Sequence, residues 1–300
     1  MTKILTFGEI IWDVYPDKKL IGGAGLNFAA HAAKCGAESY MMSATGRDVL
    51  GDDALSCMSK FGVRSELIKR CNKPTGQCLV TLNERGIPSY NVLCDMAYDN
   101  ISVGDDEITR IKQTGFDAIY FGTLIQRSRV SRESLHRLLK ECNFNEKICD
   151  VNLRKDCFDE SSSLFCLENA TILKISDEEE PTLRQLGHYT PANNTPESIA
   201  EAIHEKHPNI KHIIITLGDK GAFVYCADEL RHFTMPSPPV KVASTVGAGD
   251  SFIAAWATSI LSGSTPEIAT ERAVKLSGFV VSKTDAIPSY YFENDILHEH

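Results

Sequence analysis

Short apolar runs alternate with stretches of helical spacing along this chain, and this alternation limits its fold more than any other feature. Apolar runs of three to five residues that end near Gly, Asp or Ser are typical of strands buried on both faces of a parallel sheet. The runs are Ile4–Phe7, Ala118–Phe121, Lys147–Cys149, Ile172–Ile175 and His212–Thr216. The helical stretches are Leu26–Lys34, Ser131–Glu141, Ser198–Lys206 and Phe252–Leu261. We therefore predict an α/β fold, a doubly wound and mostly parallel sheet flanked by helices, with ligands at the carboxyl ends of its strands.

Two segments, Val14–Gly23 and Gln77–Ile101, interrupt this alternation. In the second segment, the β-type runs Gln77–Leu82 and Tyr90–Leu93 flank Asn83–Gly86, which is typical of a hairpin. We predict a small inserted β-sheet. It either covers the substrate as a lid or extends an edge of the main sheet.

The charge balance excludes several classes of partner. The chain has 31 Lys and Arg against 40 Asp and Glu, a formal net charge of −9, so it lacks the broad basic field of proteins that bind nucleic acid or anionic lipid. The longest run without a charged residue, Ser251–Pro266, has 16 residues, whereas a membrane span needs about 20. Gly8 and Glu9 interrupt the apolar start before a secretory signal can form. We expect a cytoplasmic protein with no nucleic-acid or membrane partner.

The cysteines and histidines give no metal signature. None of the ten Cys forms a C-x-x-C pair, so we expect reduced thiols that behave as small apolar side chains. His204, His207 and His212 lie in a polar stretch without a Cys or carboxylate at ligand spacing. We expect them to be surface histidines.

Gly247-Ala248-Gly249-Asp250 joins a β-type run to a helix. Glycines there let the backbone turn and point N–H groups at an anion, and the helix N-terminus adds partial positive charge. Asp250 then suits a general base that takes a proton from an attacking hydroxyl, or it simply caps the helix. A second glycine turn, Thr216–Gly221, either approaches a nucleotide by its backbone or only ends a strand.

Near the N-terminus, Asp13 and Asn27 flank the pair Gly22-Gly23. A carboxylate and an amide together suit neighbouring hydroxyls, so they point to a neutral polyol; the alternative is an ordinary strand exit with an Asn near a helix start. The P-loop pattern, the H-R-D and D-F-G triplets and G-x-G-x-x-G are all absent. ATP, if bound, is therefore held by another scaffold, and dinucleotide redox chemistry loses its main signature.

These motifs resemble the ribokinase-like carbohydrate kinases, with a Gly-Gly motif near the N-terminus and a Gly-Ala-Gly-Asp motif near the C-terminus, across essentially all 300 residues. The chain looks most similar to the bacterial fructokinase branch. Five ordered blocks carry this likeness: Gly8–Val14, Gly22–Ala29, Ala97–Asp99, Phe121–Ser128 and Asp150–Arg154.

The resemblance implies one ribokinase-like kinase domain over residues 1–300, with a lid formed by about residues 14–23 and 77–101. It implies ATP-dependent transfer of the γ-phosphoryl group to a primary hydroxyl of a neutral sugar, with D-fructose as the leading substrate. Kinases for 2-keto-3-deoxygluconate, ribose or adenosine are alternatives within the enzyme class, and a catalytically silent sugar- or nucleotide-binding regulator is the alternative outside it. ATP and Mg²⁺ are the implied cofactors, and a homodimer through the lid is a further option.

The resemblance also implies roles for individual residues. Asp250 would be the base, the amides of Gly247, Ala248 and Gly249 would hold the transferring phosphoryl group, and Arg154 would neutralise its charge. The sugar would contact Asp13, Gly22, Gly23, Asn27, Asn152 and Tyr98. The nucleotide would contact Ser176, Thr216, Gly218, Gly221 and Thr245, and Glu179 would order Mg²⁺ through water.

Three positions depart from the family pattern. Ser244 stands where the family usually has Asp, Ser176 where it usually has Asn, and Asp285 precedes Ala286 where Gly is usual. The first and third border a monovalent-cation site in many members, so potassium activation stays open here.

Overall fold

A nine-stranded sheet forms the centre of the computed structural model, which describes residues 1–82, 88–293 and 296–299. The strand order is β13-β12-β11-β10-β9-β8-β1-β4-β5, and the seven strands from β11 to β5 run parallel. They are β11 (His212–Thr216), β10 (Ile172–Ser176), β9 (Glu146–Asp150), β8 (Ala118–Phe121), β1 (Lys3–Phe7), β4 (Glu38–Gly46) and β5 (Arg64–Cys71). At one edge, β12 (Ala222–Cys226) and β13 (Arg231–Met235) add antiparallel. The five predicted runs are β1 and β8 to β11, which confirms the doubly wound, mostly parallel sheet.

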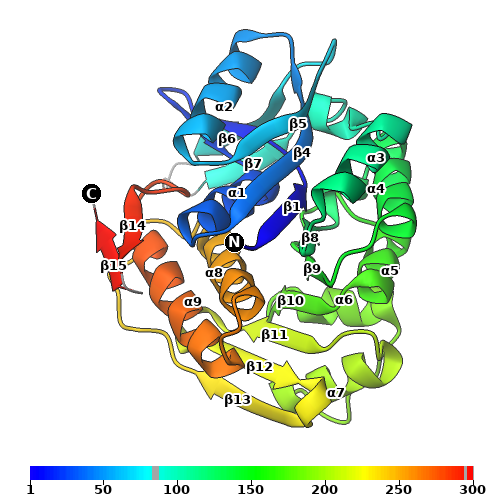
Figure 1. The fold of residues 1–300 in the computed structure, drawn as a ribbon. Helices are drawn as coiled ribbons and strands as arrows, with labels where there is room; N and C mark the ends of the chain where they lie inside the picture. Colours follow the sequence, from blue (N-terminus) through cyan, green and yellow to red (C-terminus); the bar gives the residue numbers. More distant parts are fainter. Residues whose placement is uncertain (83–87, 294–295, 300) are drawn as a thin grey trace.

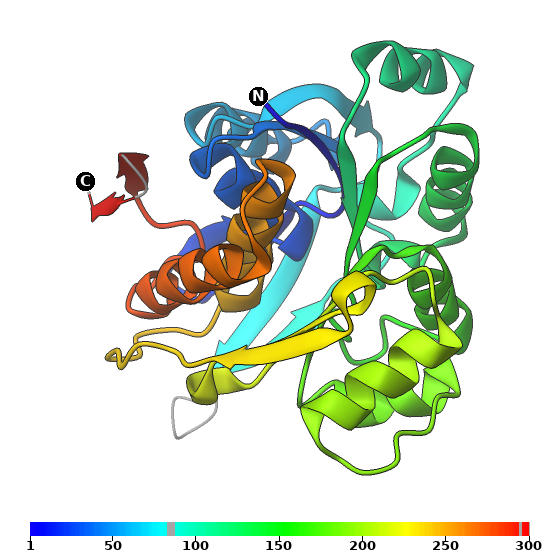
Figure 2. The ribbon, with the colours of Figure 1, turned by 60° about the horizontal axis from the view of Figure 1, so that its bottom comes forward.

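Helices cover both faces of this sheet because neighbouring strand residues point to opposite sides. Ile4 and Ile172 share a core with α1 (Ala24–Lys34), α8 (Ala248–Leu261) and α9 (Pro266–Val281). Leu5 and Leu173 share the opposite core with α3 (Asp105–Thr114), α4 (Arg129–Glu141), α5 (Glu160–Asn169), α6 (Glu180–Gly187) and α7 (Pro196–Lys206). Figures 1 and 2 show the orange helices α8 and α9 on one side of the sheet and the green helices on the other. A third cluster of buried apolar side chains includes residues of α2 (Val49–Lys60).

A second, four-stranded sheet lies apart from the main one. Its order is β3-β2-β6-β7, with β2 (Ile11–Val14), β3 (Lys19–Gly22), β6 (Gly76–Leu82) and β7 (Pro88–Val92). β2 and β6 pair parallel, and the other two pairings are antiparallel. The predicted hairpin is therefore confirmed as β6–β7, while its turn, Asn83–Gly86, lies outside the described residues. Extension of a main-sheet edge, the alternative reading of these segments, is wrong.

Two expectations from the sequence need correction. Of the three histidines expected at the surface, His204 and His212 are half-buried, and His207 is buried, 6% exposed, because its ring hydrogen-bonds the backbone of Gly187. The small sheet begins at Ile11 and ends at Val92, and the segment after it contains a 3₁₀ turn at Ala97–Asn100 in place of further strand.

In residues 1–82, 88–293 and 296–299, no helix is long and apolar enough to cross a membrane. The same residues contain no group of three or more His, Cys, Asp or Glu side chains placed to hold a metal.

Candidate active site

The predicted site residues lie at the carboxyl ends of the parallel strands of the main sheet, beside the start of α8. Arg154 follows β9, Glu179 follows β10, and Gly218 follows β11, so all three come from the carboxyl ends of adjacent parallel strands. Asn27 reaches the same place from the first turns of α1, and Asp13 comes from the small sheet. Open α/β sheets bind their ligands at these carboxyl ends of the strands.

The turn into α8 depends on Gly247. This residue is the N-cap of the helix with φ +82°, and a Cβ there would lie 2.7 Å from the carbonyl oxygen of Ala286. The Ala286 loop is anchored in turn, because its carbonyl accepts from Nε2 of the buried His31 at 2.8 Å while Nδ1 of His31 accepts from the Tyr290 hydroxyl at 2.6 Å. Burial lowers the pKa of His31 to about 4, so this neutral tautomer is the one present near pH 7.

Asp250 lies in the first turn of α8 and is only 9% exposed. Its Oδ2 accepts from Nδ2 of Asn27 at 2.7 Å, and no side chain caps this helix. The alternative that Asp250 serves as the helix cap is therefore wrong. Burial raises the pKa of Asp250 above the ordinary aspartate value. A carboxylate of raised pKa is a stronger proton acceptor, provided that it is ionised at the working pH.

Asn27 has one amide atom engaged and one left over. Its Nδ2 donates to Asp250, whereas its Oδ1 is buried and accepts from no described residue, although the side chain is only 3% exposed. The Oδ1 atom lies 3.5 Å from the point where a Cβ on Gly22 would lie, so the glycine leaves space beside it. Buried polar atoms nearly always have a partner, so this acceptor is the natural place for a donor brought by a ligand.

Asp13 faces the same region from β2, where it stands opposite Cys78 of β6. Burial raises the pKa of Asp13 to about 6, and the charge of Arg154 and a hydrogen bond from Cys78 oppose that rise. Arg154 itself is exposed, and its charge also lowers the pKa of Asp250. Arg154 is thus within electrostatic reach of both carboxylates.

Glu179 is held in one orientation by three donors. Its Oε1 accepts from the backbone N–H of Leu153 at 2.8 Å, and its Oε2 accepts from the backbone N–H and the hydroxyl of Ser176 at 2.9 and 2.8 Å. Burial would raise its pKa, but the charge of Lys174 and these hydrogen bonds lower it. A carboxylate that stays ionised with both oxygens already engaged fits a role in ordering Mg²⁺ through water better than direct ligation.

The glycine turn after β11 is built for close approach. Gly218 and Gly221 have φ of +60° and +100°, and a Cβ on Gly221 would fall 1.9 Å from the carbonyl oxygen of Met235. Thr216 ends β11 beside Ser176, with which it is in register. Thr245 is exposed just before Gly247, where its carbonyl accepts from the N–H of Ala248 at 3.3 Å. Their contacts with a nucleotide stay predictions.

Two further residues, Tyr98 and Asn152, are predicted to contact the sugar. Tyr98 is fully buried, and its hydroxyl accepts from Nη2 of Arg127 at 2.5 Å, while the same guanidinium contacts both oxygens of Asp99. Asn152 adopts a left-handed backbone conformation with φ +43°. Sugar binding by these two residues stays a prediction, and the hydroxyl of Tyr98 already has a partner.

Ser244 and Asp285, the departures near the expected cation site, lie on two loops that flank Gly247. The hydroxyl of Ser244 accepts from the backbone N–H of Val246 at 3.2 Å. Asp285 is exposed. Neither observation tests potassium activation.

The sequence reasoning missed two buried charges at this site, Lys174 and Glu9. Lys174 Nζ lies 3.0 Å from each carboxylate oxygen of Asp150, and the signal was a lysine inside the apolar run Ile172–Ile175. Glu9 follows β1, and its Oε1 accepts from the backbone N–H of Gly25 at the start of α1. Burial raises the pKa of Glu9, and the charge of Asp250 adds to that rise.

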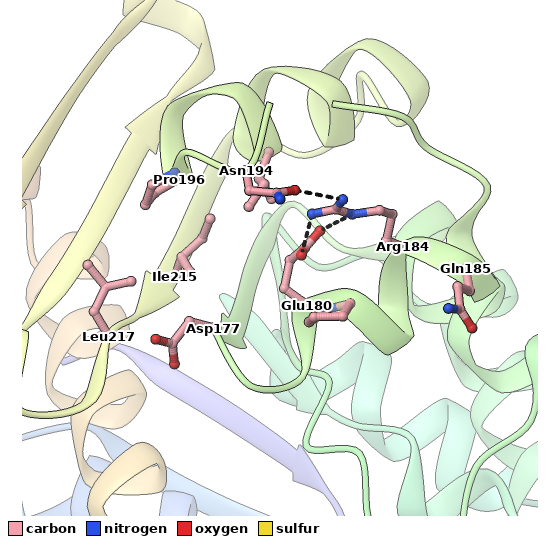
Figure 3. A pocket seen from close by; sticks show the side chains of 10 residues that line it. Asp177, Glu180, Arg184, Gln185, Asn194, Pro196, Ile215 and Leu217 are labelled. Atoms are coloured by element: carbon pink, nitrogen blue, oxygen red, sulfur yellow. Dashed lines mark hydrogen bonds and ion pairs between the residues drawn. The ribbon is translucent and has the colours of Figure 1, made fainter. Parts of the chain in front are cut away.

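A cavity of about 530 Å³ lies near the glycine turn, on the face of the sheet that carries α6 and α7. Asp177, Ile215 and Leu217 line it from the ends of β10 and β11 (Figure 3). On its far wall, Arg184 pairs with Glu180 and donates to Asn194. The side chain of Ile215 belongs to the core on the face of the sheet opposite α8.

Comparison with known proteins agrees with this geometry. The chain matches the pfkB family carbohydrate kinases over residues 1–291. An uncharacterised sugar kinase of Pyrococcus horikoshii is 30% identical over 257 residues, covering 83% of this chain and 76% of that protein, and its crystal structure superposes with a TM-score of 0.78. Fructokinase-2 of Solanum lycopersicum is 26% identical over 286 residues, covering 87% and 83% of the two chains.

A protein of Escherichia coli described as a ribokinase II, solved with ATP and Mg²⁺, has a TM-score of 0.82 at 22% identity and covers 96% of this chain and 95% of that one. At that identity it shows the fold alone. The main sheet and the small second sheet therefore have the ribokinase-like fold. The chain belongs to the pfkB family of carbohydrate kinases.

Proposed function

We propose that the protein transfers the γ-phosphoryl group of ATP to a primary hydroxyl of a neutral sugar, with D-fructose preferred. The contact between Asn27 and Asp250 carries this proposal. It joins a buried carboxylate, at the start of a helix with a glycine turn, to a buried amide oxygen that lacks a partner. A sugar presents neighbouring hydroxyls that donate and accept, so one hydroxyl satisfies Asn27 Oδ1 while the next meets Asp250.

In this mechanism, Asp250 accepts the proton of the sugar hydroxyl as that oxygen attacks the γ-phosphorus atom. The bond from that phosphorus to the oxygen bridging it to the β-phosphate breaks, and ADP leaves with this oxygen. The backbone N–H groups of Gly247, Ala248 and Gly249, at the positive end of α8, stabilise the charge on the phosphoryl oxygens. Arg154, which is exposed, adds a positive charge. Asp13 and Asn27 hold the remaining hydroxyls so that the reactive one points at Asp250.

Magnesium fits this site through Glu179. The pKa of Glu179 lies below the ordinary value, so the side chain is ionised, and its two oxygens are oriented by Ser176 and Leu153. Glu179 would hold water molecules around Mg²⁺, and the ion, when bound with ATP, neutralises phosphate charge. Ser176 supports this by fixing Glu179, in addition to its predicted place beside the nucleotide.

The charge of the sugar side favours a neutral substrate. Asp13 and Asp250 both face it, so a sugar acid such as 2-keto-3-deoxygluconate would meet two carboxylates, with Arg154 as the nearby cation. Similarity to a tomato fructokinase supports D-fructose as the leading substrate of this proposal. Ribose and adenosine kinases are the runners-up. A catalytically silent sugar-binding regulator is the alternative outside the enzymes, and the intact Asp250 and both glycines argue against it.

An assay that couples ADP release to substrate addition tests this proposal across D-fructose, ribose, 2-keto-3-deoxygluconate and adenosine. We expect the kcat/KM for D-fructose to exceed the others by about tenfold or more, since a site built to pair hydroxyls rejects guests that leave its groups unpaired. A higher value for another compound would transfer the assignment to that substrate. Sugar binding without ADP release from any compound would support the regulator.

Changing Asp13 to Asn should impair sugar use selectively. We expect the sugar KM to rise about 10- to 100-fold, because a hydrogen bond to a charged group contributes about 1.5–3 kcal/mol, while the KM for ATP stays within about twofold. In the wild type, the carboxyl titrates at about 6, so the sugar KM should rise as the pH falls through that value. Asp13→Asn should remove this dependence.

The matched control is Asp17→Asn, on the exposed turn between β2 and β3, which should change neither KM. If Asp13→Asn raises both KM values equally, Asp13 has a structural role instead.

We further propose that residues 1–300 act as one kinase domain and that the small sheet is its lid. Asp13 lies on this sheet, so a bound sugar links the sheet to α1 and α8. Amide hydrogen exchange in residues 11–22 and 76–82 should slow on saturation with sugar, because closure excludes water from the reacting groups. The edge strand β13 is the internal control and should exchange unchanged. Unchanged exchange in the small sheet would contradict a lid.

Leu79 and Tyr90 lie on opposite faces of the small sheet, and both are exposed. Apolar side chains on an open sheet suit contact with a second copy, so a homodimer through the lid remains part of the proposal. Light scattering of the wild type and of a variant with both residues changed to Lys measures it.

A further inference from the structure

We propose that Lys174 is a fixed cation of the active site, which completes the phosphoryl-binding turn from inside the protein and stabilises the charge on the transferring group. This inference rests on the proposed kinase function. It assigns a role to a residue that the motifs of the sequence did not indicate.

The position of Lys174 carries the first step. It lies inside β10 between Leu173 and Ile175 and is only 6% exposed. Its Nζ lies 2.8 Å from the point where a Cβ on Gly249 would lie, so the ammonium group occupies the side-chain space of the first turn of α8. Gly249 lies within the helix without a positive φ, so the approach of the lysine, and not the backbone conformation, is what a side chain at this position would meet.

The hydrogen bonds of Lys174 leave it able to bind an anion. Its ammonium group donates to Asp150, at 3.0 Å to each carboxylate oxygen. An ammonium group has three donors. In the part of the chain that the structure describes, no acceptor other than Asp150 contacts this nitrogen. One donor therefore stays available next to Gly249.

The charge of Lys174 is maintained by its surroundings. Burial alone would lower its pKa, but the charges of Asp150 and Glu179 raise it above the ordinary lysine value. The same ammonium lowers the pKa of Asp250 and of Glu179. Lys174 is thus within electrostatic reach of the proposed base and of the proposed magnesium-ordering carboxylate.

A purely structural ion pair would not need this location. Removing two charges from water is costly, and apolar pairs of similar volume often replace buried ion pairs without loss of stability. The β9–β10 interface is otherwise apolar, with Ile148 beside Ile172. A buried ammonium is, however, well suited to phosphoryl transfer, in which preorganised charge stabilises the equatorial oxygens without reorganisation. Arg154 is exposed, whereas Lys174 is buried and held by Asp150.

The test removes both charges together. In the double variant Asp150→Asn, Lys174→Met, no unpaired charge is left in the core, so the variant should fold. We expect its kcat to fall about 100-fold, the typical loss for one preorganised donor, while the sugar KM stays within about threefold. If the double variant retains more than about a third of the wild-type kcat, the ion pair is structural and the proposal is overturned. If this variant does not fold, the Asp150→Asn, Lys174→Gln variant keeps a hydrogen-bonded neutral pair for the same measurement.

Binding gives a readout independent of turnover. Calorimetry should show that the double variant loses about tenfold or more in affinity for AMP-PNP, which carries a γ-phosphoryl group, and about twofold or less for ADP. Equal losses for both nucleotides would indicate general distortion and contradict the proposal. The matched control, Glu180→Gln with Arg184→Met, removes an ion pair on the other face of the sheet and should not change the AMP-PNP to ADP ratio.

The two proposals fail differently. A wild-type protein that phosphorylates none of the four compounds would defeat the proposed function. A wild type that turns over, together with a neutral double variant that is equally fast, would defeat the role of Lys174 alone.

Discussion

The Asp250→Asn variant should lose about 10²- to 10⁴-fold in kcat, or about 3–5 kcal/mol of transition-state stabilisation, while it keeps its fold and its affinity for nucleotide. An amide has the shape of the carboxylate but cannot accept the sugar proton. Nδ2 of Asn27 can still donate to its side-chain oxygen, so the packing at the start of α8 is retained. Single-turnover measurement of kcat, with calorimetry for ATP, gives the two quantities separately.

Stability separates a catalytic role from a structural one. Burial raises the pKa of Asp250 in the folded protein above its value in the unfolded chain. Ionisation of this carboxyl therefore lowers the free energy of unfolding at neutral pH. This loss of stability develops as the pH rises from the pKa of the unfolded chain through the pKa of the folded protein. Asp250→Asn should therefore unfold at the wild-type temperature or above it at pH 7. A variant that keeps more than about a tenth of the wild-type kcat would reject Asp250 as the base.

The Gly247→Ala variant should be the second most damaging change at the site. The residue has φ +82°, and the new Cβ would lie 2.7 Å from the Ala286 carbonyl oxygen, which His31 and Tyr290 hold in place. The backbone must shift, and the N–H groups that face the phosphoryl group shift with it. We expect kcat to fall about 100-fold or more and the free energy of unfolding to fall by about 2–4 kcal/mol.

Gly263→Ala is the matched control for this change. Gly263 also has a positive φ, +89°, but a Cβ there meets no atom within 4 Å. The control isolates backbone strain, which costs about 1 kcal/mol, and kcat should not change. Similar losses of kcat in both variants would show that strain, and not contact with the Ala286 loop, explains the effect at Gly247. Steady-state kinetics and urea denaturation of the two variants measure these effects.

The predictable part of the fold is the part set by local pattern. Strands buried on both faces read as continuous apolar runs, so β1 and β8 to β11 were found within one residue at each end. Edge strands escaped this criterion; along β13, for example, His232 is exposed while its neighbours are half-buried. The starts of α1 and α8 were placed too late, because Ala24-Gly25 and Ala248-Gly249 are helical despite their glycines.

Of the site, the sequence alone determined the residue types and the local geometry: a glycine turn that must precede a helix, and a carboxylate directly after it. These depend on backbone freedom and chain neighbours, which are local properties. Tertiary structure alone decided which distant groups meet. Asn27 and Asp250 are 223 residues apart in sequence. Lys174 lies in strand β10, and its ammonium group lies beside Gly249 of helix α8. Such contacts depend on strand order and on how helices cross the sheet, and no pattern within one segment encodes them. The same reason explains why a lysine in an apolar run became visible as a site residue only once β9, β10 and α8 were packed together.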